Sequence, residues 1–318
     1  MTDDIYQARL IPLGGTDIYA AYDNPFTSDK VRGHLLRSEG GGAAKGQVVF
    51  CPGFTEFCEK YAHIGAHLTK AGYDVLMIDW PGQGRSGHFG THSEYVNLDD
   101  FETHLRALEA LLDEAGWTEN LVIFGHSMGG HLSLRAADRF ADRIKAVMLS
   151  APMIRPMAGP AAGVRLLGKM LDRLGLGGRR APFQIHLSAA TARQAGSLNP
   201  LTHDAAFFDL SYQLYDKEPA LRRAVPTVNW VRAAYRSCVQ TSLNPQWMAG
   251  IKQPVLALLA EQEYICHNPS AKRALSWLNT AEIHVIDGAR HEILNELPEI
   301  QARIWPLYLR FLERQFSS

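Results

Sequence analysis

The sequence predicts an α/β protein: a mostly parallel central sheet flanked by helices, with a helical cap inserted between late strands. Short apolar runs alternate with stretches of helical periodicity along most of the 318 residues, which is typical of parallel strands joined by helices. The alternation stops between residues 155 and 250, a span too long for a structureless loop inside a compact domain. We therefore expect a core formed by residues 1–154 and 251–318 and a cap formed by residues 155–250.

Six apolar runs are the predicted strands, because each is short and ends at Gly, Pro or polar residues. They lie at residues 46–54, 73–84, 120–127, 144–153, 253–263 and 281–291. Helical patterns lie at residues 59–71, 99–115, 128–139 and 298–315. Within the cap, residues 164–178 form an amphipathic segment whose apolar side chains either line an acyl channel or pack into the core, and the spacing alone favours the core.

The bulk composition is that of a soluble globular protein. The chain is 46% hydrophobic and carries a formal net charge of -1, so no overall basic excess points to nucleic acid. The start lacks a basic segment followed by an apolar one, so we expect no signal peptide, and no apolar run reaches the roughly 18–20 residues that span a bilayer. The four cysteines show no metal-ligand spacing and are expected to be buried and reduced. These features predict a cytoplasmic enzyme and also permit one peripheral to the membrane.

Charge is distributed unevenly along the chain. Residues 155–250 hold twelve Lys and Arg against five Asp and Glu, a charge of +7, so the other residues carry -8 because the whole chain is -1. A basic cap above an acidic body either attracts an anionic head group or membrane face, or is a solvated helical surface with no such role. The sequence leaves both interpretations open.

The strongest local signal is Ser127 in the run LVIFGHSMGGHLSLRAA, residues 121–137. A nucleophilic serine needs its Oγ lifted out of the sheet by a sharp strand-to-helix turn, which strains its backbone and crowds the residues two before and two after it. Gly125 and Gly129 occupy those positions, where a Cβ would collide with neighbouring elements. Because an apolar strand precedes the motif and a helical pattern follows it, we predict that Ser127 is a nucleophile.

A serine at neutral pH needs a base, and the base needs a group that orients it. His291 follows the last predicted strand, as the chain order serine, acid, histidine requires. The acid should follow the strand at residues 253–263, where the candidates are Glu261 and Glu263. Side chains alternate along an extended segment, so both point the same way and alternation does not choose between them.

The oxyanion of an ester-hydrolysis intermediate needs two backbone donors held in place before the reaction. Met128 N–H is one expected donor, because it follows the nucleophile at the start of a helix. The other should come from the loop after the first predicted strand, where Gly53 permits a tight turn and leaves the N–H of Phe54 as the donor.

With these residues in place, the chain resembles the α/β-hydrolase superfamily and, within it, the lysophospholipase and monoacylglycerol lipase group. The resemblance rests on GHSMGG (125–130), DWPGQGRSG (79–87), PGFTEFCEKY (52–61), GARHEILNE (288–296) and, in the cap, NPLTHDAAFF (199–208). It implies the α/β-hydrolase fold and a serine esterase activity. It spans nearly the whole core and is weaker in the cap.

The chain departs from the pattern of that group at two places. The oxyanion loop of the group usually opens with His-Gly, whereas this chain has Pro52-Gly53 and keeps only the backbone donor. The acid is commonly Asp, whereas this chain reads AEQEYICHN over residues 260–268. Aligning YICHN with the end of the group's motif puts Glu263 at the catalytic position, so the resemblance favours Glu263 over Glu261.

The predicted reaction is attack of Ser127 on an acyl carbonyl and hydrolysis of the acyl-enzyme by water, which calls for no metal or cofactor. The resemblance and the apolar cap favour a single-chain lipid ester, either a lysophospholipid or a monoacylglycerol, and the basic cap slightly favours the phosphate-bearing one. One alternative is a small-ester carboxylesterase or a proline-iminopeptidase-like hydrolase. An alternative of another class is a non-catalytic binding protein that keeps the fold.

Overall fold

The computed structural model describes residues 13–24, 30–90, 92–156, 161–182, 184, 187–194 and 199–317. The start of the chain, on which the signal-peptide prediction depends, lies outside these residues. All four cysteines lie inside them and are buried and unpaired, which confirms the expectation of reduced thiols.

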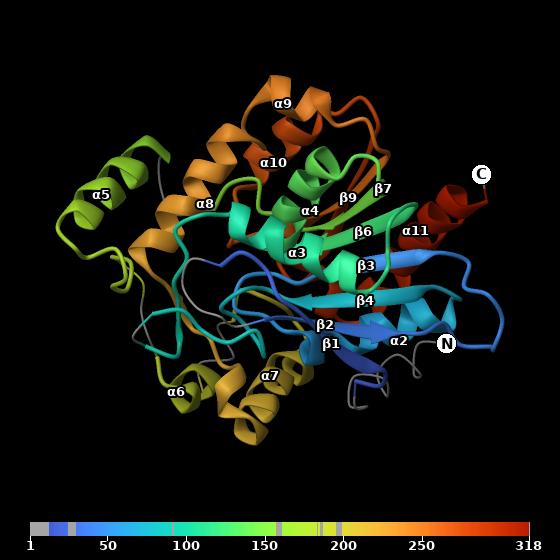
Figure 1. Ribbon diagram of the computed structural model, residues 1–318, viewed down its shortest axis with the longest axis horizontal. Coiled ribbons are helices and arrows are strands. Elements are labelled where there is room, and N and C mark those ends of the chain that lie inside the picture. The colour runs from blue at the N-terminus through green and yellow to red at the C-terminus, as the bar shows by residue number, and fades with distance from the viewer. Residues whose placement is uncertain are drawn as a thin grey trace.

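An eight-stranded sheet forms the centre of the molecule and confirms the predicted fold class (Figure 1). Its order is β1-β2-β4-β3-β6-β7-β9-β10, and every neighbouring pair from β4 to β10 is parallel. The strands are β1 (Thr16–Ala20), β2 (Val31–Leu36), β3 (Gln47–Cys51), β4 (Asp74–Asp79), β6 (Leu121–His126), β7 (Ile144–Ser150), β9 (Val255–Gln262) and β10 (Ala281–Arg290). All six predicted strands are present, and the sheet has two more.

The two strands that the sequence did not predict are β1 and β2, which pair antiparallel with each other and with β4. β2 has no apolar run, because Arg32 and His34 interrupt it. Arg32 is nevertheless buried, since its guanidinium pairs with Asp79 at 2.9 Å and with Glu59 at 2.8 Å. Charge pairing therefore allows a polar segment to enter the sheet.

Helices cover both faces of the sheet, as the alternating pattern predicts. On one face α3 (Glu102–Glu114), α4 (Met128–Arg139) and α10 (Asn268–Leu275) pack into one apolar cluster. On the other, α2 (Ala62–Lys70) and α11 (Pro298–Phe316) pack into a second cluster. The 3-10 helices η1 (Cys58–Tyr61) and η4 (Ile293–Asn295) lie in the loops after β3 and β10. The residues of α4 are those that the pattern predicts.

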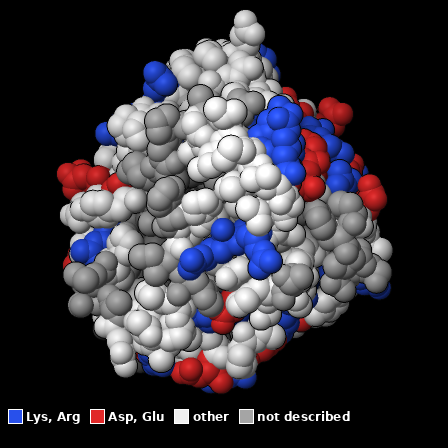
Figure 2. Space-filling view, turned by 90° about the vertical axis from the view of Figure 1, so that its left-hand side faces the viewer, with Lys and Arg blue, Asp and Glu red and all other residues white. Residues whose placement is uncertain are grey.

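The segment from residue 155 to residue 250 connects β7 to β9 and is mostly helical. Its elements are α5 (Ala161–Arg173), α6 (Ala189–Gln194), α7 (Ala205–Lys217), η3 (Pro219–Leu221), β8 (Val225–Pro226), α8 (Val228–Gln240) and α9 (Pro245–Gly250). It also holds the two-residue strand β8, which pairs with β5 (Tyr95–Val96) because a loop of the core passes beside it. Helices α5 and α6 lie at the left side of Figure 1, and α7 lies at the bottom of the view. Figure 2 shows that side, where Lys and Arg side chains form a row across the middle.

The apolar side chains of helix α5 are more exposed than the sequence pattern predicts. Leu166, Met170 and Leu174 are 72%, 52% and 67% exposed, so the expectation that they pack into the core is wrong. The helix packs against α8, while Leu166 and Met170 on it and Leu174 just after its end remain exposed. No described helix is both long and apolar enough to cross a membrane.

The carboxyl ends of the parallel strands meet at one edge of the sheet, which is where ligands bind in open α/β folds. The loops after β3, β6, β9 and β10 all reach this edge. They hold the predicted oxyanion donor Phe54, the predicted nucleophile Ser127, the candidate acid Glu263 and His291, whereas Glu261 lies near the end of β9 itself.

Candidate active site

Ser127 lies between the end of β6 and the start of α4 with φ +52° and ψ -118°. Few residues other than glycine adopt such a conformation, so the turn holds Ser127 in a strained backbone. A Cβ added at Gly129 would overlap the carbonyl oxygens of Cys51 and Pro52, and one at Gly125 would overlap Gly129. The two glycines therefore allow helix, strand and oxyanion loop to approach one another closely.

The structure brings Ser127, His291 and Glu263 together. Nε2 of His291 is 2.9 Å from Oγ of Ser127, and Nδ1 is 2.7 Å from Oε2 of Glu263. The three residues come from the ends of β6, β10 and β9, and the side chains of Glu263 and His291 are buried. An imidazole in this position can accept the hydroxyl proton at one nitrogen while the carboxylate holds the other.

The two candidate acids differ in position. Glu261 is still inside β9, exposed, and its Oε2 accepts the N–H of Gly288 at 2.8 Å. Glu263 follows the end of β9 and its buried carboxylate contacts His291. Of the two candidates, only Glu263 has the position that the base requires.

Glu263 is held in its ionised form. Burial alone would raise the pKa of its carboxyl group, but the charge and hydrogen bond of His291 and the N–H groups of Cys266 and Ile265 together keep that pKa below the usual value. Those two N–H groups donate to Oε1 at 3.0 and 2.8 Å. An ionised, immobile carboxylate stabilises the imidazolium that forms when His291 takes a proton.

The loop after β3 lies directly against Ser127. A Cβ added at Gly53 would lie 3.1 Å from the Cβ of Ser127. The carbonyl oxygens of Pro52 and Gly53 accept hydrogen bonds from Trp80 Nε1 at 2.8 Å and Gln83 Nε2 at 3.0 Å. The stretch DWPGQG, which begins at the last residue of β4, therefore stabilises the oxyanion loop through these two hydrogen bonds.

Glu56 is a second support of this loop, and the sequence analysis did not identify it. Its Oε2 accepts the N–H of Gly53 at 2.5 Å, which fixes the turn just before Phe54. Although burial raises the pKa of the Glu56 carboxyl, the ammonium group of Lys60 beside it lowers that pKa to about 2. A buried carboxylate thus supports the loop that opens with Pro52.

Lys60 joins the loop after β3, called here the oxyanion loop, to the loop after β10 that holds His291 and Glu292, called here the histidine loop. Its Nζ donates to Glu56 Oε1 at 2.8 Å and to Glu292 Oε1 at 2.6 Å. Burial alone would lower the pKa of Lys60, but the two carboxylates raise it above its usual value. The sequence did offer a signal, because Glu56 and Lys60 are opposite charges four residues apart and Glu292 directly follows His291.

The histidine loop is also bound to the segment 199–203, which lies in the motif NPLTHDAAFF. The contacts are Glu292 N–H to Leu201 O at 2.7 Å, Thr202 Oγ1–H to Asn295 O at 2.7 Å, and Arg290 Nη1–H to Asn199 O at 2.8 Å. The buried carboxylate of Glu296 accepts the N–H of Arg290 at 2.8 Å and that of His203 at 3.1 Å. This motif of the 155–250 segment is therefore part of the support of His291.

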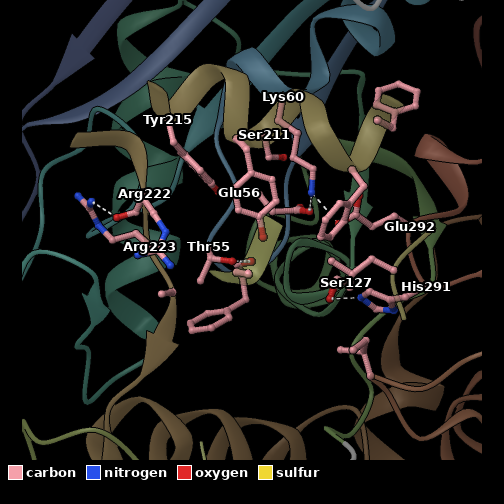
Figure 3. Close-up of a pocket in the computed structure, with 18 of the residues that line it drawn as sticks. Thr55, Glu56, Lys60, Ser127, Ser211, Tyr215, Arg222, Arg223, His291 and Glu292 are labelled. Carbon is pink, nitrogen blue, oxygen red and sulfur yellow. Dashed lines mark hydrogen bonds and ion pairs between the residues drawn. The ribbon is translucent and has the colours of Figure 1, made fainter. Parts of the chain in front are cut away.

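A cavity of about 440 Å³ opens beside Ser127, a size typical of sites for small organic ligands. Figure 3 shows Ser127 and His291 on one side of it and Arg222 and Arg223 on the other. Lys60 extends between Glu56 and Glu292 in the same view. The aromatic and aliphatic part of the lining comes mainly from the oxyanion loop and the 155–250 segment, with Phe54, Leu187, Leu201, Phe207, Phe208 and Ile265.

Comparison with known proteins agrees with this geometry. Solved structures share the fold: a soluble variant of monoglyceride lipase from Saccharomyces cerevisiae has a TM-score of 0.73 at 17% identity and covers 96% of this chain and 98% of its own. Monoacylglycerol lipase from Paleococcus ferrophilus has a TM-score of 0.69 at 22% identity, covering 90% and 99%. The protein therefore has the α/β-hydrolase fold.

Sequence comparisons identify its family. The family model described as "Serine aminopeptidase, S33" matches residues 42–298, and the chain belongs to that family of serine hydrolases. It is 32% identical to "Lysophospholipase L2" of Escherichia coli (strain K12) over 288 residues, 85% of this chain and 81% of the relative. It is 24% identical to "Monoacylglycerol lipase" of Mycolicibacterium smegmatis over 260 residues, 79% and 83%. The resemblance found in the sequence motifs is confirmed.

Proposed function

We propose that the protein hydrolyses the carboxylic ester of a single-chain lipid, a lysophospholipid or a monoacylglycerol, through an acyl-enzyme. The observation that carries the proposal is the chain of contacts from Glu263 through His291 to Ser127, at 2.7 and 2.9 Å. The names of the relatives, lysophospholipase and monoacylglycerol lipase, support this substrate class.

In the proposed reaction, Oγ of Ser127 attacks the acyl carbonyl while Nε2 of His291 accepts the hydroxyl proton. Glu263 orients the imidazole and stabilises its positive charge. The N–H groups of Phe54 and Met128 hold the developing oxyanion, and His291 then returns its proton to the leaving alcohol. A water molecule activated by His291 attacks the acyl-enzyme and frees the fatty acid and Ser127.

We also propose that residues 155–250 form a cap over this site and that the cap contacts lipid. The cavity is walled on one side by side chains of this segment, so a substrate lies between it and the core. Helix α5 exposes the apolar Leu166 and Met170 beside the basic Lys169 and Arg173, and the exposed Leu174 follows its end. This combination is typical of a helix that lies on an anionic membrane surface. Four buried, unpaired thiols favour a reducing compartment, so the proposed location is cytoplasmic and peripheral to the membrane.

A series of p-nitrophenyl esters of increasing chain length, measured beside a monoacylglycerol and a lysophospholipid, tests the proposal. We expect kcat/KM to rise from acetate to decanoate, because the cavity lining offers aromatic and aliphatic surface to the acyl group. The family model bears the description of an aminopeptidase, so aminoacyl p-nitroanilides belong in the same series. Highest activity on acetate or on an aminoacyl anilide would contradict the lipid-ester proposal.

A further inference from the structure

The charges that line the cavity are paired unequally at its two ends. Near Ser127, the ammonium group of Lys60 lies between the carboxylates of Glu56 and Glu292, so each charge has an opposite partner. At the opposite side Arg222 forms an ion pair with Glu94. Arg223, beside it, differs from Lys60 and Arg222 in the kind of groups that contact its charge.

Arg223 is 5% exposed, and the hydrogen bonds of its guanidinium all go to backbone carbonyl oxygens. The acceptors are Gly82 O at 2.9 Å, Gly87 O at 2.6 Å, Ala220 O at 2.7 Å and Arg222 O at 3.0 Å. Within the part of the chain that the structure describes, no carboxylate lies within 4.0 Å of it. Carbonyl groups satisfy N–H donors but do not cancel a charge, and the carboxylates of Asp79 and Glu94 act on Arg223 only from beyond 4.0 Å. A buried cation without a contacting counterion therefore lies against the cavity.

The guanidinium also keeps one donor for a ligand. It has five N–H groups, and four of them have the acceptors given above, which leaves one on Nη2 with no acceptor among the described residues. Burial lowers the pKa of Arg223, although it stays charged at neutral pH. Burial also raises the pKa of Tyr215 to about 12, so its hydroxyl remains a neutral donor in the same lining.

We propose that Arg223 is the anion-binding end of the pocket and that it selects esters whose head group carries a phosphate. The inference rests on the proposed ester hydrolysis at Ser127 and names the class of substrate for that site. A phosphate oxygen placed at Nη2 would supply a counterion in direct contact, and guanidinium groups bind phosphate well because their donors match its geometry. The ester carbonyl then lies at Ser127 while the phosphate lies at the opposite wall.

Two substrates with the same acyl chain test the assignment: 1-oleoyl lysophosphatidylglycerol and 1-oleoylglycerol, each dispersed in the same neutral detergent. We expect Arg223→Gln to lower kcat/KM for the anionic lipid about tenfold or more, the effect of losing a hydrogen bond to a charged group, with little change for the neutral lipid. Arg223→Lys keeps the charge and should restore part of the preference. Arg193 on α6 forms ion pairs with Asp209 and Asp216 on α7. Arg193→Gln removes an equal charge there and should leave the ratio of kcat/KM for the two lipids unchanged.

Inhibition of the wild-type protein gives a second measurement that needs no variant. Glycerol 3-phosphate should inhibit p-nitrophenyl butyrate hydrolysis competitively at concentrations where glycerol does not. An equal fall for both lipids in Arg223→Gln, or equal inhibition by glycerol and glycerol 3-phosphate, would overturn the proposal. Inhibition by inorganic phosphate as strong as that by glycerol 3-phosphate would assign the site to free phosphate instead of a head group. Absence of any p-nitrophenyl ester hydrolysis by the wild type would refute the proposed function, which is a different result.

Discussion

The two walls of the pocket differ in how their polar groups are satisfied. On the core wall, Ser127, His291, Glu56 and Lys60 all have protein partners within 2.9 Å. The other wall, from residues 155–250, includes Arg223, which has no carboxylate within 4.0 Å among the described residues. Away from the pocket, the same segment leaves apolar side chains of α5 exposed. We propose from this difference that the core wall carries the chemistry and that the 155–250 segment determines which ester reaches it.

If this division is right, core variants should slow every ester alike. Ser127→Ala should have the largest effect and reduce kcat by about 10⁴-fold or more, because both the nucleophile and the acyl-enzyme are lost. Steady-state hydrolysis of p-nitrophenyl butyrate and of 1-oleoylglycerol measures it, with circular dichroism to show that the variant folds. Residual activity of a tenth of the wild type on either ester would place the nucleophile elsewhere.

The next effect in size concerns the acid. Glu263→Gln should lower kcat by about 10³-fold, because an amide neither holds the imidazole tautomer nor stabilises its charge. The matched control is Glu261→Gln, which removes a carboxylate two residues away whose contact is the N–H of Gly288. That control should change kcat less than threefold, and equal losses in the two variants would contradict the assignment of Glu263.

Glu56→Gln should lower kcat about tenfold on all esters, since it loosens the turn before Phe54 and one oxyanion donor is worth about 10²–10³ when lost completely. Glu114→Gln, an exposed carboxylate on α3, is the matched control. A fall in kcat confined to the lipid substrates would contradict a role of Glu56 in the oxyanion loop. It would also contradict the assignment of substrate choice to the 155–250 wall alone.

The effect of Glu56→Gln on the free energy of unfolding should depend on pH. The pKa of Glu56 is lowered from 4.5 to about 2 in the folded protein, so its ionised form stabilises the fold above about pH 4.5, and that contribution is lost as the pH falls toward 2. Urea unfolding should show wild type more stable than Glu56→Gln at pH 7, with a smaller difference at pH 3. A difference that stays constant between these pH values would contradict an ionised Glu56.

The smallest predicted effect concerns membrane binding by helix α5 of the 155–250 segment. Leu166→Ser with Met170→Ser should weaken sedimentation with anionic phosphatidylglycerol vesicles several-fold, because two exposed apolar side chains leave the face of α5. Hydrolysis of soluble p-nitrophenyl butyrate should be unchanged. Val285→Ser, which alters an exposed apolar side chain on β10, is the control for general surface effects. Unchanged vesicle binding in the double variant would remove α5 from the proposed membrane contact.

The elements that the sequence predicted best are those whose structure depends on neighbours in the chain. The turn at Ser127 and the extent of α4 follow from glycines and an apolar strand within a few residues. The choice between Glu261 and Glu263 was harder, because both lie at the end of one strand and side-chain alternation does not separate them. The family resemblance favoured Glu263, and the contact with His291, 28 residues further along, distinguishes it in the structure.

Contacts between distant segments were not predictable in this way. Glu292 and Lys60 are 232 residues apart in the sequence and meet only because β3 and β10 end at the same edge of the sheet. Arg32 enters β2 because carboxylates from other segments surround it. The exposed face of α5 has the same spacing as a buried one, so periodicity alone predicted the wrong environment for Leu166 and Met170.

Activation of Ser127 by His291 is the central claim, and covalent labelling tests it most directly. The wild-type protein, treated with a fluorophosphonate at neutral pH and digested, should carry one phosphonate adduct in the peptide that contains Ser127, as read by mass spectrometry. His291→Ala should carry almost none in the same time, because the serine then lacks its base. Equal labelling of Ser127 in both proteins, or an adduct on another residue in the wild type, would contradict the account.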